Sequence, residues 1–126
     1  METKEQKAWR EVKYHEKFLN AFRGLRVFWS TTRNLYVHIF VALVAVFFGF
    51  YFEISGFEWI ALIFAISFVF VSEAFNTAIE IDIDLTSPEY HPFARDTKDV
   101  AAAAVLLAVF TAIIIGLIIF LPKIFI

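Results

Sequence analysis

Three long apolar stretches divide the chain into oily and polar parts. They cover residues 35–52, 59–81 and 100–121, and polar side chains are few within them. Each stretch is close to the ~20 residues that an α-helix needs to cross a bilayer of ~30 Å. The pattern therefore predicts three transmembrane helices, joined by loops at 53–58 and 82–99.

The polar segment before the first stretch has a helical pattern of its own. Residues 1–16 form a highly polar arm. Within the next segment, 17–33, four apolar side chains fall at about 0°, 40°, 340° and 20° around a helix: Phe18, Phe22, Leu25 and Trp29. This spacing predicts an amphipathic helix in the headgroup layer, facing the cytoplasm. Such a helix either anchors the chain or closes over a site at the interface.

The second predicted span carries a polar stripe on one face. At ~100° per residue its four members fall at about 0°, 300°, 340° and 20°: Glu73, Asn76, Glu80 and Asp84. A carboxylate at membrane depth is costly and marks a functional site by default. The competing interpretation is that the stripe serves helix packing or caps the interface.

Small residues recur at every fourth position of the third predicted span: Ala104, Ala108, Ala112 and Gly116. Such a ridge lets helix backbones approach closely. We therefore expect close packing along it, within one chain or between subunits. Pro122 and Lys123 are expected to end this helix.

The composition supports a membrane protein. Of the 126 residues 60% are hydrophobic and 17 are Phe, which is too oily for a small water-soluble core. The chain has no Cys, so disulfides and thiolate chemistry are excluded. The formal net charge of −2 does not identify a partner, because the signs are segregated along the chain.

The cations predict the orientation. Eight of the eleven Lys and Arg lie in the first 33 residues, the loop 53–58 has none, and the loop 82–99 has Arg95 and Lys98. This is the positive-inside pattern of a cytoplasmic N-terminus and an external C-terminus. His38, the polar residue of the first span, then lies near the cytoplasmic end, and we interpret it as an interfacial or packing residue rather than a ligand.

The second predicted loop adds charged groups beside the stripe: Glu89, His91, Arg95, Lys98 and Asp99. Glu73 and Glu80 are seven residues, or ~10 Å, apart along a helix, so they suit separate tasks rather than one shared ion. One can act as a base while the other holds a hard cation, and nearby Lys and Arg suit phosphoryl transfer. No glycine-rich phosphate loop exists, which excludes Walker-type and protein-kinase-type sites. From the residues alone, a small transporter is equally possible.

The longer motif resembles a known family. The run Glu73-Ala-Phe-Asn76-Thr-Ala-Ile-Glu80, with Asp84, Glu89-Tyr90-His91 and Lys98-Asp99, is similar to the prokaryotic diacylglycerol kinases, small homotrimeric membrane enzymes unrelated to soluble kinases. The resemblance extends from about residue 17 to the end. Further positions are most similar to the branch that phosphorylates undecaprenol: Thr31, Arg33-Asn34, His38, His91-Pro92 and 116–122.

The resemblance implies a role for each motif residue. Glu73 matches the general base, which takes the proton from a lipid hydroxyl as that hydroxyl attacks the γ-phosphate of ATP. Glu80 matches a glutamate that holds Mg²⁺, and Asn76 matches an active-site asparagine between them. The remaining motif residues match positions that contact the nucleotide: Glu89, Tyr90, His91, Lys98 and Asp99.

One position departs from the family pattern. Where the family has a second metal-binding glutamate in the run T-E-R-N, this chain has Thr31-Thr32-Arg33-Asn34. Thr32, expected on the surface helix near Glu80, offers only a neutral hydroxyl, so Mg²⁺ would be held by Glu80, the phosphates and water. This change motivates an alternative, a catalytically impaired relative that binds lipid or nucleotide without efficient turnover.

We therefore expect one all-α integral membrane domain over 1–126, located in the bacterial inner (plasma) membrane. The predicted activity is ATP- and Mg²⁺-dependent phosphorylation of a membrane lipid, undecaprenol or otherwise diacylglycerol. Because one three-helix chain could hardly enclose both a lipid hydroxyl and ATP, we expect a homotrimer. No nucleic-acid partner is expected, and a small transporter is the remaining alternative.

Overall fold

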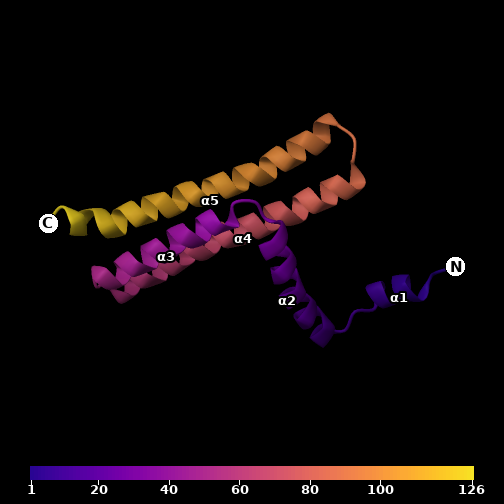
Figure 1. The fold of residues 1–126 in the computed structure, drawn as a ribbon, viewed down its shortest axis with the longest axis horizontal. Helices are drawn as coiled ribbons and strands as arrows, with labels where there is room; N and C mark the ends of the chain where they lie inside the picture. Colours follow the sequence, from indigo (N-terminus) through magenta and orange to yellow (C-terminus); the bar gives the residue numbers. More distant parts are fainter. The chain divides into compact units, whose positions relative to one another are not determined.

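The computed structural model describes all 126 residues and consists of five α-helices without strands (Figure 1). In chain order they are α1 Lys4–Arg10, α2 Tyr14–Thr31, α3 Leu35–Tyr51, α4 Gly56–Thr86 and α5 Pro92–Ile124. The chain divides into two compact units, Met1–Thr31 and Thr32–Ile126. The predicted all-helical class is confirmed.

The first unit contains α1 and α2. The polar arm 1–16, for which no element was predicted, forms α1 because a capping box starts the helix: Gln6 donates its backbone N–H to the Thr3 hydroxyl, and Thr3 donates its own to the Gln6 side chain. The helix predicted over 17–33 is found as α2. Its apolar stripe is exposed along its whole length in this chain.

The helix α2 ends before Thr32, so Thr32 does not lie on it as predicted. The hydroxyls of Ser30 and Thr31 donate to the carbonyl of Val27, which is a common local competitor of helical bonding. Asn34 then adopts a left-handed conformation with φ 57°, which asparagine tolerates better than most residues. The chain therefore turns at 32–34, and α3 begins at the buried Leu35.

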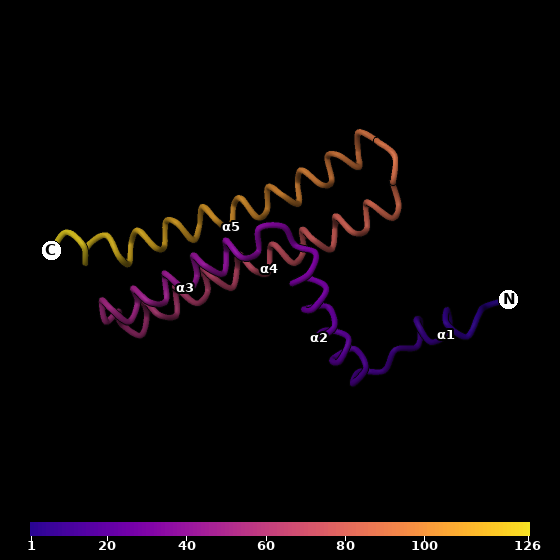
Figure 2. The backbone as a smooth tube through the Cα atoms, viewed as in Figure 1, coloured from indigo at the N-terminus to yellow at the C-terminus, as the bar shows by residue number.

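The second unit contains α3, α4 and α5, which lie side by side (Figure 2). A tight connection joins α3 to α4, where Ser55 caps α4 in a second capping box with Glu58. The two helices approach closely at Gly49, since a Cβ atom built there would lie 2.6 Å from the Trp59 ring. At the same end, the rings of Phe48 and Phe120 join α3 to α5.

The predicted spans 59–81 and 100–121 are parts of longer helices. α4 continues to Thr86 and α5 begins at Pro92, so the loop predicted over 82–99 is wrong and only 87–91 connects the two helices. Hydropathy indicates which residues suit lipid, and it does not show where a helix ends in water. Proline at the first helical position and the His91 ring, which accepts from the backbone N–H of Phe93, start α5 early.

The C-terminal end of α5 also differs from the prediction. The helix passes through Pro122 and ends at Ile124 rather than at residues 122–123. Pro122 has no N–H to donate to the carbonyl of Ile118, so the last turn continues without that one bond. Of the predicted small-residue ridge, Ala108 is fully buried, Ala112 and Gly116 are half-buried, and Ala104 is exposed. The close-packing prediction is therefore confirmed for only part of the ridge.

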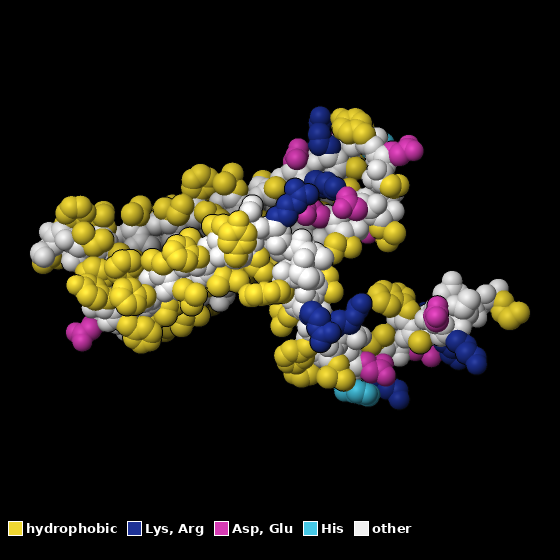
Figure 3. Space-filling view, in the orientation of Figure 1, with side chains coloured by type: hydrophobic (Ala, Val, Ile, Leu, Met, Phe, Trp, Pro, Cys, Tyr) yellow, Lys and Arg dark blue, Asp and Glu magenta, His cyan; other side chains and the backbone are white.

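Most large apolar side chains of the second unit point outward. Figure 3 shows hydrophobic side chains covering much of the visible face of α3, α4 and α5. Contiguous apolar surface of this extent needs a lipid or protein neighbour. By length and composition α4 and α5 each suit a membrane span, while α3, with 17 residues, qualifies only when it is counted with the helix before it. The count of three spans stays a prediction.

Candidate active site

The predicted base Glu73 lies on α4 with only 9% of its surface exposed. Its Oε1 atom is 2.7 Å from Nε2 of His38, which lies in the first turns of α3. From the sequence, His38 was interpreted as an interfacial or packing residue; the structure brings it into contact with the predicted base. The available signal was an imidazole in an otherwise apolar span.

The polar stripe opens into one hollow, which we call the carboxylate cleft. It has a volume of about 180 Å³ and is lined by Thr32, Arg33, Glu73, Asn76, Thr77, Glu80, Asp84 and Lys98. The single-face stripe predicted from helical spacing is thereby confirmed. The cleft contains three carboxylates and two cations, so anionic and cationic groups of a substrate both find partners there.

Asn76 links the stripe internally. Its side-chain nitrogen Nδ2 donates to Oε1 of Glu80 over 3.2 Å. Its carbonyl oxygen Oδ1 is buried and has no hydrogen-bond partner in the chain. A buried polar atom without a partner is costly, and such atoms are found where a ligand, ion or water binds.

The oxygen atoms of the cleft suit a Mg²⁺ ion that is bound jointly by the protein and by the phosphates of a ligand. The chain holds no cluster of three or more Asp, Glu or His side chains that could bind a metal alone. Mg²⁺ commonly takes one or two protein oxygens and completes its shell with phosphates and water. Glu80 and the unpartnered oxygen of Asn76 offer such a pair of hard ligands.

Thr32 lines the same cleft as Glu80. Its hydroxyl lies 2.7 Å from the hydroxyl of Thr77, which is buried on α4. The predicted nearness to the stripe is therefore confirmed, although Thr32 precedes α3 instead of lying on the surface helix. In this chain the hydroxyl bonds to a neutral partner and not to a carboxylate.

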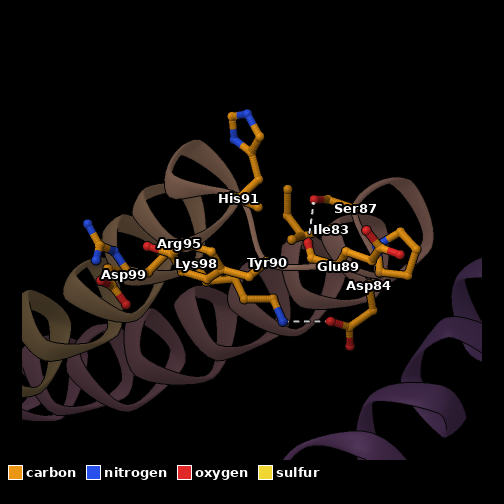
Figure 4. Close-up of a pocket in the computed structure, with 11 residues that line it drawn as sticks. Ile83, Asp84, Ser87, Glu89, Tyr90, His91, Arg95, Lys98 and Asp99 are labelled. Carbon is orange, nitrogen blue, oxygen red and sulfur yellow. Dashed lines mark hydrogen bonds and ion pairs between the residues drawn. The ribbon is translucent and has the colours of Figure 1, made fainter.

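A second hollow, the loop pocket, lies where α4, the connection 87–91 and α5 meet. Its volume is about 260 Å³, and Figure 4 shows the side chains around it. It brings together all five residues that the family resemblance matched to nucleotide contacts: Glu89, Tyr90, His91, Lys98 and Asp99. In this view the His91 ring points away from Lys98, so the five residues line the pocket without converging on one point.

An ion pair connects the two hollows. Nζ of Lys98 lies 2.5 Å from Oδ1 of Asp84, and both residues line the carboxylate cleft and the loop pocket (Figure 4). The side chains of Lys98 and Asp84 are 40% and 69% exposed. Such exposed pairs stabilise a fold by at most ~1 kcal/mol. Lys98 can therefore leave Asp84 and bind a phosphate with little loss of stability.

A third hollow, the apolar groove, lies among α3, α4 and α5. It has a volume of about 490 Å³, and its lining is almost entirely carbon. His38 is the one polar side chain that lines it. Because His38 also bonds to Glu73, the apolar groove meets the carboxylate cleft at this pair.

The chain was compared with known proteins. The family described as prokaryotic diacylglycerol kinase matches residues 19–120. The undecaprenol kinase of Bacillus subtilis (strain 168) is 39% identical over 111 residues, which cover 88% of this chain and 90% of that protein. The diacylglycerol kinase of Escherichia coli (strain K12) is 30% identical over 94 residues, covering 75% and 77%. The diacylglycerol kinase of Synechocystis sp. is 33% identical over 106 residues, covering 83% of this chain and 61% of that protein.

Proposed function

The chain belongs to the prokaryotic diacylglycerol kinase family, and we propose that this membrane lipid kinase transfers the γ-phosphate of ATP to undecaprenol. The acceptor is inferred from the Bacillus subtilis relative, which is named an undecaprenol kinase and aligns over most of both chains. Diacylglycerol is the second candidate, because two other relatives are named for it.

The observation that carries the proposal is the position of Glu73. This carboxylate lies where the apolar groove ends at His38 and the carboxylate cleft begins. A lipid hydroxyl at that point has its hydrocarbon on the apolar side and a phosphoryl group on the polar side. A reaction between a membrane alcohol and a water-soluble phosphate donor requires such a boundary.

In the proposed reaction Glu73 accepts the hydroxyl proton. The lipid oxygen forms a bond to the γ-phosphorus, the bond between that phosphorus and the bridging oxygen breaks, and ADP leaves. Base catalysis of this kind typically supplies ~10²–10⁴ in rate. Arg33 and Lys98, which line the cleft, balance the charge of the transferring group.

Glu80 and Oδ1 of Asn76 would hold the Mg²⁺ that neutralises charge on the phosphates. We place the nucleotide in the loop pocket, where Lys98 can exchange Asp84 for a phosphate. Tyr90 is exposed beside the same pocket, and its ring can stack on the adenine of the nucleotide. Glu89, His91 and Asp99 provide the remaining polar groups.

The proposal also covers the arrangement in the membrane. We place the loop pocket on the cytoplasmic side, because ATP is there and because the cations follow the positive-inside pattern. The inner membrane, three spans and the amphipathic helix α2 on the membrane surface complete this arrangement. A homotrimer would cover part of the outward-facing apolar surface of α3–α5.

A phosphoryl-transfer assay tests the acceptor. Purified protein in mixed micelles receives labelled ATP with undecaprenol or diacylglycerol at equal mole fraction. We expect the higher kcat/KM with undecaprenol, and the reverse order would assign the protein to diacylglycerol. Absence of transfer to both lipids, with ATP binding retained, would favour the impaired alternative that the bond between Thr32 and Thr77 suggests.

A further inference from the structure

We propose that His38 is a positioning residue that holds the Glu73 carboxylate in the orientation needed to accept the lipid proton. The inference rests on the proposed function, in which Glu73 is the base. The inference adds His38 to the site. This residue lies on α3 and is not part of the polar stripe on α4.

The contact between the two side chains is short and shielded. The atoms Nε2 of His38 and Oε1 of Glu73 are 2.7 Å apart, which is within the range of charge-assisted hydrogen bonds. The side chains are 22% and 11% exposed, so water competes weakly for either group. The Glu73 side chain makes no other hydrogen bond within the chain, so its second oxygen, Oε2, is left for the substrate.

The direction of the hydrogen bond follows from the chemistry of the base. A carboxylate that is ready to take a proton carries none, so Glu73 accepts and the ring donates its Nε2–H. A neutral imidazole with its proton on Nε2 is sufficient for this bond. One oxygen of Glu73 is then fixed by His38, which also fixes where Oε2 points.

His38 lies near the start of α3, on the boundary of the apolar groove. It lies one turn after Asn34, whose left-handed conformation sets the start of α3, and after Leu35, which is only 5% exposed. Its ring lines the apolar groove as the one polar member. A lipid hydroxyl arriving from the hydrocarbon side therefore meets His38 and Glu73 together.

A packing role alone does not explain an imidazole at this position. The rest of α3 is built from apolar and aromatic side chains, any of which would fill the space without burying a polar ring. Burying a ring nitrogen is costly unless it is hydrogen-bonded, and its partner here is the predicted base. The bond to the predicted base, at the boundary between the apolar groove and the carboxylate cleft, is what distinguishes His38 from a helix-packing residue.

Two substitutions separate the hydrogen bond from the shape of the side chain. His38→Leu removes the donor, and His38→Gln keeps an amide N–H that can reach the same carboxylate. We expect His38→Leu to lower kcat roughly ten- to a hundredfold, because misplacing a reacting group by ~1 Å can cost about 10²-fold. KM for ATP should change less than twofold, and His38→Gln should recover a large part of kcat. Tyr36→Leu, at an exposed position of the same turn, is the matched control with unchanged rates.

The same changes are made in a Glu73→Gln background. If His38 acts through Glu73, His38→Leu lowers the residual rate of Glu73→Gln no further. A full-rate Glu73→Gln enzyme would overturn the base assignment and with it the proposed mechanism. An inactive Glu73→Gln enzyme beside a His38→Leu enzyme that keeps more than half of kcat would overturn only the present inference. Equal losses in His38→Leu and His38→Gln would also overturn it, in favour of a shape requirement.

Discussion

At the scale of single residues, Asn76 gives the cleft an acceptor that no group of the chain satisfies. Its nitrogen holds one oxygen of Glu80, while its own oxygen is buried without a partner. Leaving a buried acceptor unpaired costs ~1–3 kcal/mol. A cation or a hydrogen-bond donor that binds beside Glu80 would remove that cost. Binding there should therefore stabilise the fold.

Thr32 provides a test of the proposed Mg²⁺ site. Its hydroxyl bonds to Thr77 and lies on the cleft that holds Glu80, so Thr32→Glu introduces a second carboxylate there. Because added negative charge strengthens Mg²⁺ binding, the Mg²⁺ concentration for half-maximal activity should fall several-fold. A Mg²⁺ titration of the transfer rate measures this midpoint.

The neutral variant Thr32→Gln is the control for size, and its midpoint should not fall. An unchanged or raised midpoint in Thr32→Glu would mean that Thr32 is not at a ligand position and that the site has formed around the bond to Thr77. The new glutamate would then be an unpaired charge in the cleft, and activity would decrease.

At the scale of elements, helical spacing predicted more than hydropathy did. The spacing placed Glu73, Asn76 and Glu80 on one face of α4, and all three line one cleft. Hydropathy misplaced the ends of α4 and α5, because a helix can continue into water when local caps favour it. The start of α1 was not predicted, although the capping-box pair Thr3 and Gln6 is a sequence signal for it.

Close packing of α3 on α4 depends on Gly49. A Cβ at this position would lie 2.6 Å from the Trp59 ring, which packs against Phe50 with ring centroids 4.8 Å apart. Gly49→Ala should therefore force the ring or the helix to move and destabilise the fold by ~1–3 kcal/mol. Thermal unfolding in detergent, followed by circular dichroism, measures the loss.

Gly116 is the matched control, since a Cβ there meets nothing within 4 Å. Gly116→Ala should leave the unfolding temperature unchanged or raise it, because alanine favours a helix interior. Equal unfolding temperatures for Gly49→Ala and the wild type would show that α3 and α4 are farther apart than described.

The far ends of α4 and α5 are joined by an ion pair that should respond to acid. Lys123 bonds to Glu58 over 2.9 Å, outside the predicted spans. This bond, followed by the backbone N–H of Ser55, holds the pKa of Glu58 below its ordinary value. A lowered pKa means that the pair stabilises the fold at neutral pH, and that this contribution is lost as the pH falls through the lowered pKa.

Lys123→Met removes the largest cause of that shift. The pKa of Glu58 should rise toward its ordinary value, so the variant should unfold at a lower temperature than the wild type at pH 7. The difference should shrink as the pH falls below the ordinary carboxyl range. A difference that stays constant from neutral pH to acid would contradict an electrostatic origin.

At the scale of the whole molecule, the sequence predicted which polar residues line one cleft but not which helices meet. Charge at membrane depth identified Glu73, yet its contact with His38 joins positions 35 residues apart and depends on how α3 packs on α4. No local sequence pattern specifies how α3 and α4 are aligned along each other. The number of spans has the same limitation, because α3 is at the short end of what can cross a bilayer.

Cysteine labelling decides the arrangement in the membrane, and the chain is suited to it because it has no native Cys. Four single substitutions at exposed positions show on which side of the membrane each segment lies: Lys4→Cys, Glu53→Cys, Thr86→Cys and Ile126→Cys. With three spans and a cytoplasmic N-terminus, a membrane-impermeant maleimide should label Glu53→Cys and Ile126→Cys in intact cells. Lys4→Cys and Thr86→Cys should react only after the cells are permeabilised.

The Lys4→Cys variant separates two spans from three. If α3 crosses the bilayer, Lys4 lies on the side opposite Glu53, and the two variants label differently. If only α4 and α5 cross, Lys4 and Glu53 share a side and label alike, while Thr86→Cys still differs from both. Labelling of Thr86→Cys in intact cells would place the loop pocket outside, away from cytoplasmic ATP, and would contradict the proposed kinase orientation whatever the number of spans.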